Sequence, residues 1–82
     1  MIMEVADTAT NLRKIREEVL GASREDVLRR THSVSLGTVR NAEMGKRVKR
    51  VKACQLLTAI NEMLIERGRQ TVKMNDLGLE VY

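Results

Sequence analysis

The sequence contains no proline, phenylalanine or tryptophan, and Tyr82 is its only aromatic residue. Sheets of β-sandwiches and barrels draw on aromatic and β-branched side chains, so this composition favours helices packed through aliphatic residues. Cys54 and His32 are also the only residues of their kind. They are too few for an intramolecular disulfide, a cysteine-based metal cluster or a His-based triad in one chain. We therefore expect no cofactor, and a lone cysteine suits a reducing cytoplasm.

Long apolar runs are also missing from the sequence. None approaches the roughly 20 residues that a membrane-spanning helix requires. The start of the chain has no basic segment followed by an apolar stretch, so no secretory signal is visible. With 82 residues, of which 43% are hydrophobic and 32% charged, the chain has the composition of an ordinary globular domain. We expect one cytoplasmic domain without internal repeats and without contact to a membrane.

The net charge of +4 is unevenly distributed along the chain. Between Arg40 and Lys52, six cations and one acid, Glu43, give a local charge of +5, so the other residues sum to −1. A basic patch on a nearly neutral body is typical of a surface that binds a polyanion. A solvated loop would have the same composition, so charge alone leaves both interpretations open. The six residues, called the basic cluster below, are Arg40, Lys46, Arg47, Lys49, Arg50 and Lys52.

The periodicity of apolar residues predicts an all-α fold with four helices and one short C-terminal turn. Ser23 and Ser35 are the expected N-caps of the second and third helices, and Ser23 with Asp26 forms a capping-box variant. Gly45 and Gly68 stand where left-handed C-cap residues are expected. The helices are expected at residues 11–21, 23–31, 35–44 and 51–67, with Asp7, Thr10 or Asn11 as the first N-cap.

The fourth segment has the broadest apolar face of the chain. Cys54 lies beside this face, and we interpret it as a buried small hydrophobic residue rather than a reactive thiol. The tail at 69–82 is ambiguous from its sequence: it has one turn near Met74–Leu77 and then an extended piece in which apolar residues alternate with Glu80 and Tyr82. The apolar face consists of Ala53, Leu56, Leu57, Ile60, Met63 and Leu64.

The two middle helices are short, are joined by a tight turn and are followed by the basic cluster. This is the layout of a helix-turn-helix, whose second helix enters the DNA major groove. Three segments closely resemble the Cro and phage-repressor family of regulators, often called Xre-like. They are Leu12-Arg-Lys-Ile-Arg-Glu-Glu, Ser23-Arg-Glu-Asp-Val-Leu-Arg-Arg-Thr31 and Val34-Ser-Leu-Gly-Thr-Val-Arg-Asn-Ala-Glu-Met-Gly-Lys46.

The resemblance covers about Leu12 to Leu64, and its most specific part is Val-Ser followed by Thr-Val, Glu43, Gly45 and Lys46. It implies a compact bundle of four to five helices, a lambda-repressor-like DNA-binding domain. The helix-turn-helix domain would span 11–68, between an N-terminal arm at 1–10 and a C-terminal tail at 69–82. The turn at 31–35 and the link between the first two helices are each one residue longer than the usual family pattern.

The resemblance also implies which residues contact DNA. Arginine can pair with guanine in a bidentate way and asparagine with adenine, while apolar groups can touch the thymine methyl. Alternatively, Arg40 binds only phosphate and Asn41 is a solvated helix residue. The implied base contacts are Leu36, Gly37, Thr38, Arg40 and Asn41. The implied phosphate contacts, which set affinity and register, are Arg24, Ser35, Lys46, Arg47, Lys49 and Arg50.

Two further positions receive a structural interpretation. In the family, the acid that matches Glu43 is a partner for a basic residue of the preceding helices, here Arg29 or Arg13. Glu43 is a poor DNA contact because phosphate would repel it. Val39 and Ala42 are expected in the core beneath the exposed side of the third helix.

The function that the resemblance implies is sequence-specific binding of double-stranded DNA by a transcriptional regulator. A repressor is favoured over an activator because no activation surface is evident. The alternative is an antitoxin-like or other protein-interaction module that docks a partner through its C-terminal tail. An enzyme is disfavoured because paired carboxylates, a glycine-rich phosphate loop and a nucleophile–base set are missing. Single-stranded RNA is disfavoured because phenylalanine and tryptophan are missing as stacking platforms.

A homodimer is expected because one helix-turn-helix reads only a few base pairs, and dimers of such folds bind pseudo-palindromic operators. The wide apolar face of the fourth helix and the tail are the expected contact surface. Pairing of an exposed strand edge of the tail across a two-fold axis is one way to form this contact, and the less favoured one. Alternatively, the tail folds back over its own core. The residues expected at the surface are Leu56, Ile60, Met63, Leu64, Leu77, Leu79, Val81 and Tyr82.

Overall fold

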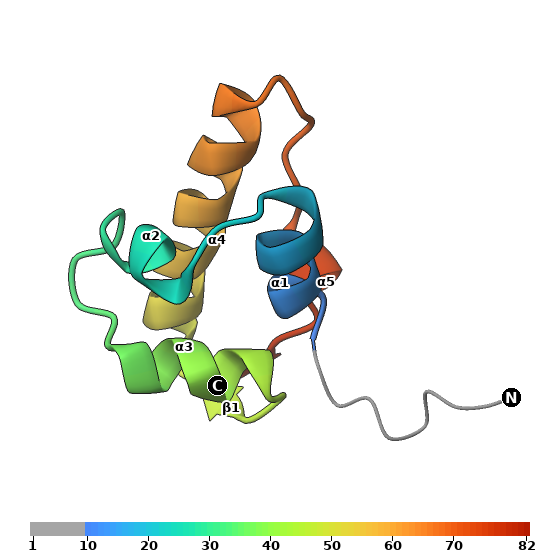
Figure 1. Cartoon of the computed structure of the whole chain (residues 1–82). Coiled ribbons are helices and arrows are strands. Elements are labelled where there is room, and N and C mark those ends of the chain that lie inside the picture. Colours follow the sequence, from blue (N-terminus) through green and yellow to red (C-terminus); the bar gives the residue numbers. More distant parts are fainter. Residues whose placement is uncertain (1–9) are drawn as a thin grey trace, which may run out of the picture.

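Helices dominate the computed structural model of the protein, which describes residues 10–82 and has 59% of them in helices. Helix α4 runs along one side of the molecule, and α3 lies across its lower end (Figure 1). This architecture agrees with the expected bundle of four to five helices. The elements are α1 (Asn11–Lys14), the π-helical turn η2 (Ile15–Val19), α2 (Arg24–Leu28), α3 (Leu36–Glu43), β1 (Arg47–Val48), α4 (Arg50–Glu66), α5 (Met74–Leu77) and β2 (Glu80–Val81).

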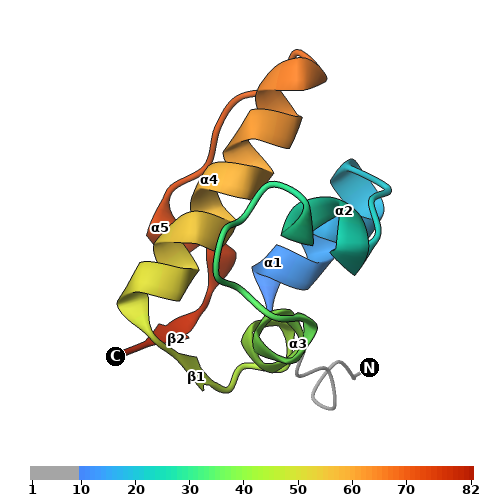
Figure 2. The same ribbon diagram turned by 90° about the vertical axis from the view of Figure 1, so that its left-hand side faces the viewer.

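The two strands join the beginning of α4 to the end of the chain. β1 and β2 pair in parallel, with Arg47 opposite Glu80 and Val48 opposite Val81. Figure 2 shows this pair beside the start of α4 and next to α3, which is seen end-on. The C-terminal tail therefore returns to the end of the molecule where α3 and the basic cluster lie.

Serine side chains begin α2 and α3, as expected. The Ser23 hydroxyl oxygen accepts a hydrogen bond from the Asp26 backbone N–H (3.1 Å), and the Asp26 carboxylate accepts one from the Ser23 N–H (3.0 Å). At α3, the Ser35 hydroxyl oxygen accepts from the Thr38 N–H (3.1 Å). Both caps satisfy backbone donors that a helix leaves unpaired at its start.

Glycines in the left-handed conformation end α3 and α4, which confirms the two predicted stops. Gly45 has a φ of 82° and Gly68 a φ of 71°. After α3, the Lys46 N–H donates to the Asn41 carbonyl (2.8 Å) and the Gly45 N–H to the Ala42 carbonyl (3.2 Å). This pair of bonds is the Schellman motif, which favours glycine because a side chain would be strained there.

The first helix differs from the single segment expected at 11–21. It has one α-helical turn and then widens into η2, where the Leu20 N–H donates to the Ile15 carbonyl five residues back (2.9 Å). Thr10 occupies the N-cap position, but its hydroxyl donates to the Ala42 carbonyl (3.2 Å) instead of capping α1. The third N-cap candidate, Asp7, lies outside the described residues.

The core is aliphatic, and α4 supplies most of it. The expected face of α4 is buried, except that Leu57 is half-buried. The prediction for Cys54 is wrong, because its side chain is exposed. Cys54 follows the fully buried Ala53, and one residue turns an α-helix by about 100° away from the buried face. Over residues 10–82, no helix combines the length and apolarity needed to cross a bilayer.

The tail folds back onto its own core, which is the alternative to the expected dimer surface. Leu77 is fully buried, and Leu79 and Val81 are half-buried while Glu80 and Tyr82 are exposed. A small core without large aromatic residues needs these aliphatic side chains for itself. The surface expected for a second copy is therefore largely occupied within one chain, because Leu56, Ile60, Met63, Leu64 and Leu77 are all buried.

Candidate nucleic-acid interface

Helix α3 turns one face to the core and the other to solvent. Its expected core residues, Val39 and Ala42, are buried. Of the five predicted base contacts, the side chains with the most hydrogen-bonding capacity are Arg40 and Asn41, and both are exposed. The complete set divides into exposed Gly37, Arg40 and Asn41 and half-buried Leu36 and Thr38.

Within residues 10–82, no close contact requires a glycine at position 37. A Cβ atom at this position would meet only the Ser35 hydroxyl oxygen, at an ordinary contact distance of 3.7 Å. Glycine in a helix interior costs up to about 1 kcal/mol relative to alanine. Packing among residues 10–82 therefore gives no reason for glycine here, whereas a molecule that approaches α3 closely would benefit from the absence of a side chain.

The C-terminal end of α3 is held by α1. The Thr10 N–H donates to the Glu43 carbonyl (3.0 Å), and the Thr10 hydroxyl donates to the Ala42 carbonyl (3.2 Å). These bonds satisfy acceptors that a helix leaves free at its end. With the Ser35 cap at its other end, α3 is anchored at both ends.

The Glu43 carboxylate binds two arginines in the interior of the protein. Arg16, on η2, donates from Nε to Oε2 (2.6 Å) and from Nη2 to Oε1 (3.1 Å). Arg24, on α2, donates from Nε to Oε1 (2.9 Å). Glu43 is 1% exposed and Arg16 is 6% exposed, and the Arg16 guanidinium also donates to the Ala22 carbonyl (2.9 Å). One carboxylate therefore joins α3 to both η2 and α2.

The structural role of Glu43 was predicted, but its named partners were wrong. Arg13 pairs with Glu17 (3.3 Å) and Arg29 pairs with Asp26 (2.6 Å), each within its own helical segment. Arg16 lies four residues after Leu12, on the helical face that Leu12 and Ile15 share, so its buried position agrees with helical periodicity. The hydrogen bond to Glu43 raises the pKa of Arg16, so this guanidinium stays charged.

Arg24 was predicted to hold a phosphate, and the structure gives it a second task. Its Nε is bound to Glu43, while its side chain remains 32% exposed. It lies at the first position of α2, directly after the Ser23 cap. Arg24 therefore links the interior carboxylate to the protein surface.

The segment between α2 and α3 is held by α4. The Gln55 side-chain oxygen accepts from the backbone N–H groups of His32 (2.9 Å) and Ser33 (3.2 Å), and its Nε2 donates to the Ser33 hydroxyl (3.0 Å). Lys52 Nζ donates to the Ser33 carbonyl (2.7 Å). These contacts set the path of the segment between α2 and α3.

The basic cluster lies at the surface without acidic partners. All of its members are exposed except the half-buried Lys52. Across residues 10–82, no member forms an ion pair with a carboxylate. The single acid in this stretch, Glu43, is turned inward and neutralised. The part of this surface made by residues 40–52 therefore presents six positive charges rather than the +5 that the sequence window contains, and the exposed Glu80 lies opposite Arg47 on the neighbouring strand.

Several of these charges are unfavourably placed for the stability of α4. Lys49 is its N-cap residue, Arg50 and Lys52 lie in its first turn, and that turn contains no acid. The N-terminus of a helix carries a partial positive charge, so cations there are repelled. An anion at this place would be stabilised by both the helix and the cations.

A small recess brings predicted base and phosphate contacts together. It has a volume of about 170 Å³ and lies between α3 and the junction of β1 with α4. Tyr82, at the end of the tail, lines the recess too, whereas the sequence interpretation assigned it only to the expected dimer surface. Its status as the only aromatic residue was the available signal. The recess is lined by Thr38, Asn41, Arg47, Val48, Lys49, Lys52 and Tyr82.

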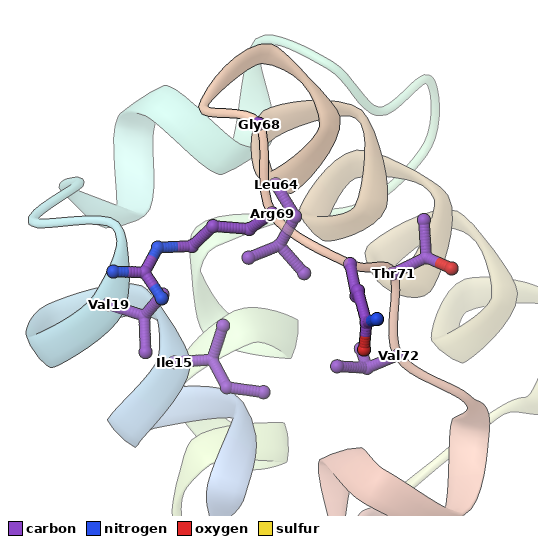
Figure 3. Close-up of a pocket in the computed structure, with 8 residues that line it drawn as sticks. Ile15, Val19, Leu64, Gly68, Arg69, Thr71 and Val72 are labelled. Carbon is purple, nitrogen blue, oxygen red and sulfur yellow. The ribbon is translucent and has the colours of Figure 1, made fainter.

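A second hollow lies away from this surface, between η2, the end of α4 and the segment after Gly68 (Figure 3). It has a volume of about 480 Å³ and a largely aliphatic wall that includes Ile15, Val19 and Leu64, and Arg69 is its only charged residue. It offers no pair of groups for acid–base chemistry. Among the described residues, no cluster of His, Cys, Asp or Glu is suited to a metal ion.

Comparison of the chain with protein-family models, curated proteins and solved structures finds no significant match. Function is therefore inferred from the chain's own residues, above all from α3, the basic cluster and the recess between them.

Proposed function

We propose that this protein is a sequence-specific, double-stranded-DNA-binding transcriptional regulator in which α2 and α3 form a helix-turn-helix. The observation that carries the proposal is the position of Arg40 and Asn41, exposed on a helix that is anchored at both ends, beside a basic cluster that forms no ion pair with a carboxylate within residues 10–82. Base-specific recognition needs such donors in the major groove, and affinity needs cations along the phosphates.

The proposed division of labour follows from the chemistry of each side chain. Arg40 pairs with guanine O6 and N7, and Asn41 pairs with adenine N6 and N7. The half-buried Leu36 and Thr38 offer apolar groups to a thymine methyl, and Gly37 allows close approach of the backbone. The phosphate contacts are Arg24, Ser35, Lys46, Arg47, Lys49 and Arg50, which neutralise charge and fix the register of α3.

The protein acts in this proposal as a cytoplasmic repressor that binds as two copies. A single α3 reads too few base pairs to select one genomic site, and a dimer would read half-sites roughly 34–36 Å apart. The tail is a poor docking element because Leu77 is buried and β2 is paired. The outer face of α4 is a better candidate for contact between copies, since Val51 and Ile65 are each 61% exposed there.

Selection from randomised DNA duplexes at a fixed salt concentration tests the proposal. The wild-type chain is expected to enrich one pseudo-palindromic motif, and its affinity should fall steeply with salt. The variant Arg40→Ala/Asn41→Ala should lose the motif but keep salt-dependent binding. A matched control is Arg69→Ala/Asn75→Ala, which removes the same exposed residue types elsewhere and should behave as wild type. Absence of an enriched motif would refute sequence-specific recognition, and absence of salt-dependent binding as well would refute DNA binding altogether.

A further inference from the structure

Tyr82 is fixed within the basic cluster by its backbone. Its N–H donates to the Val48 carbonyl (3.0 Å), and its own carbonyl accepts from the Arg50 N–H (2.9 Å). These bonds extend the pairing of β1 with β2 to the first turn of α4. The only aromatic residue of the chain is thereby held between two cations of the cluster, Arg47 and Arg50.

The Tyr82 ring supports the Arg47 guanidinium. The guanidinium carbon lies 4.7 Å from the ring centroid, which is the geometry of a cation–π contact. Arg47 is exposed and forms no ion pair within residues 10–82. The ring is therefore the group that orients this guanidinium, and the face that stacks leaves its N–H donors free at the edges.

The contact between Tyr82 and Arg47 contributes little to the stability of the fold. Tyr82 is 56% exposed, and an exposed cation–π pair contributes little to stability against the cost of ordering two side chains. Both residues line the recess that also contains Thr38 and Asn41. The ring thus holds a cation at the edge of the surface that faces DNA in the proposed function.

We infer that Tyr82 is a positioning residue of the DNA interface, which sets Arg47 in place to bind a phosphate. This inference rests on the proposed function. A guanidinium that is ordered before binding loses less rotational freedom when it meets the phosphate, so the ring raises affinity without contacting a base. The tail from α5 to Tyr82 is then part of the DNA-binding surface rather than an appendage to it.

Duplex-binding titrations of four variants of the full chain test this role: Tyr82→Phe, Tyr82→Leu, Arg47→Ala and Tyr82→Leu/Arg47→Ala. Tyr82→Phe keeps the ring and should bind as wild type. Tyr82→Leu should weaken binding about two- to fivefold, the size of an exposed cation–π contact. Arg47→Ala should also lower the salt slope by about one. In that background Tyr82→Leu should cause no further loss.

The thermal unfolding midpoint separates this role from a structural one. Tyr82→Leu keeps both backbone hydrogen bonds, so its midpoint should match that of wild type although its affinity is lower. Equal affinity of Tyr82→Leu and wild type, or a full additional loss in the Arg47→Ala background, would overturn the inference while the proposed function stands. A wild-type chain that binds no duplex would instead overturn the proposed function itself.

Tyr82 also provides a direct spectroscopic measurement. It is the only aromatic residue, so the intrinsic fluorescence of the protein reports its surroundings alone. Addition of a bound duplex is expected to change this emission in wild type. An unchanged emission at saturation would place the ring away from the interface and contradict the inference.

Discussion

Arg16 and Arg40 carry the same charged group in opposite surroundings. Arg16 is buried against Glu43, and each of its three guanidinium nitrogens donates to a protein oxygen, whereas Arg40 projects from α3 into solvent without a carboxylate partner in residues 10–82. The first guanidinium holds α3 in place. The second is free for a ligand.

The same division separates two regions of the molecule. The Glu43 network, made of Glu43, Arg16 and Arg24, joins three helical segments through one carboxylate. The basic cluster has cations that repel one another and the start of α4. Because Glu43 is turned inward, the acid that could have neutralised the cluster stabilises the fold instead. The positive charge of the basic cluster is therefore left at the surface, where a polyanion could bind.

The largest expected effect comes from breaking the Glu43 network. Glu43→Gln keeps the shape of the side chain but leaves Arg16 buried without its counter-charge, and losing one partner of a buried ion pair costs about 3–5 kcal/mol. We expect a decrease of this size in the free energy of unfolding, measured by urea denaturation. Glu18→Gln, at an exposed position, should change it by less than about 0.5 kcal/mol. Similar values for both variants would show that the network does not hold α3.

Local signals let the sequence predict the starts of α2 and α3, the ends of α3 and α4 and the main core face. Ser23, Ser35 and Gly45 act within a few residues of their own positions, so their roles follow from spacing. The partner of Glu43 was not predictable in this way. Arg13, Arg16, Arg24 and Arg29 have the same charge, and the choice among them depends on the widened turn η2 and on packing between helices.

The candidate site was predicted in part for the same reason. The basic cluster is continuous in the sequence, so composition alone reveals it. Tyr82 joins the cluster through parallel pairing of two-residue strands that are far apart in the chain, and the alternation of the tail predicts a strand but not its neighbour. Cys54 was misplaced because one step along α4 separates the buried face from the exposed one.

The next largest effect is expected for the exposed residues of α3, where DNA-binding specificity can change without a change in stability. Arg40→Ala and Asn41→Ala should each cost about 1–3 kcal/mol of binding free energy on the preferred duplex and relax the preference at one base pair. Their unfolding free energies should stay within about 0.5 kcal/mol of wild type, because neither side chain is packed. Titrations with single-base variants of the duplex measure this. If Arg40→Ala kept the base preference of wild type, Arg40 would not be a base contact.

A smaller and less specific effect is expected within the basic cluster. Lys49→Ala and Arg50→Ala should weaken binding equally for preferred and unrelated duplexes and lower the slope of log affinity against log salt by about one each. They should also stabilise the folded chain slightly, since each removes a cation from the N-terminal end of α4. Affinity measured at several salt concentrations and thermal unfolding test both parts. A sequence-dependent loss would show that these residues read bases.

The smallest effect is expected from ion pairs that are exposed. They are paired, as in the Glu43 network, but they face solvent, as the basic cluster does. Hydrogen bonds from Ser23 lower the pKa of Asp26 below its ordinary value of 3.8, and the Arg30 guanidinium lowers the pKa of Glu66 below 4.5. A lowered folded-state pKa stabilises the fold above the ordinary value, and this contribution is lost as pH falls through the lowered one. Stability should therefore decline from about pH 4.5 downward.

Asp26→Asn/Glu66→Gln should show a shallower decline in urea-unfolding stability over this pH range than wild type. The change should remain small because water screens exposed pairs such as Arg30 with Glu66. The control Glu18→Gln/Glu80→Gln removes two exposed carboxylates without ion pairs in residues 10–82 and should leave the wild-type decline intact. Equal declines in all three proteins would mean that the exposed pairs contribute nothing to stability. In that case, the Glu43 network would be the ion pairs that stabilise the fold.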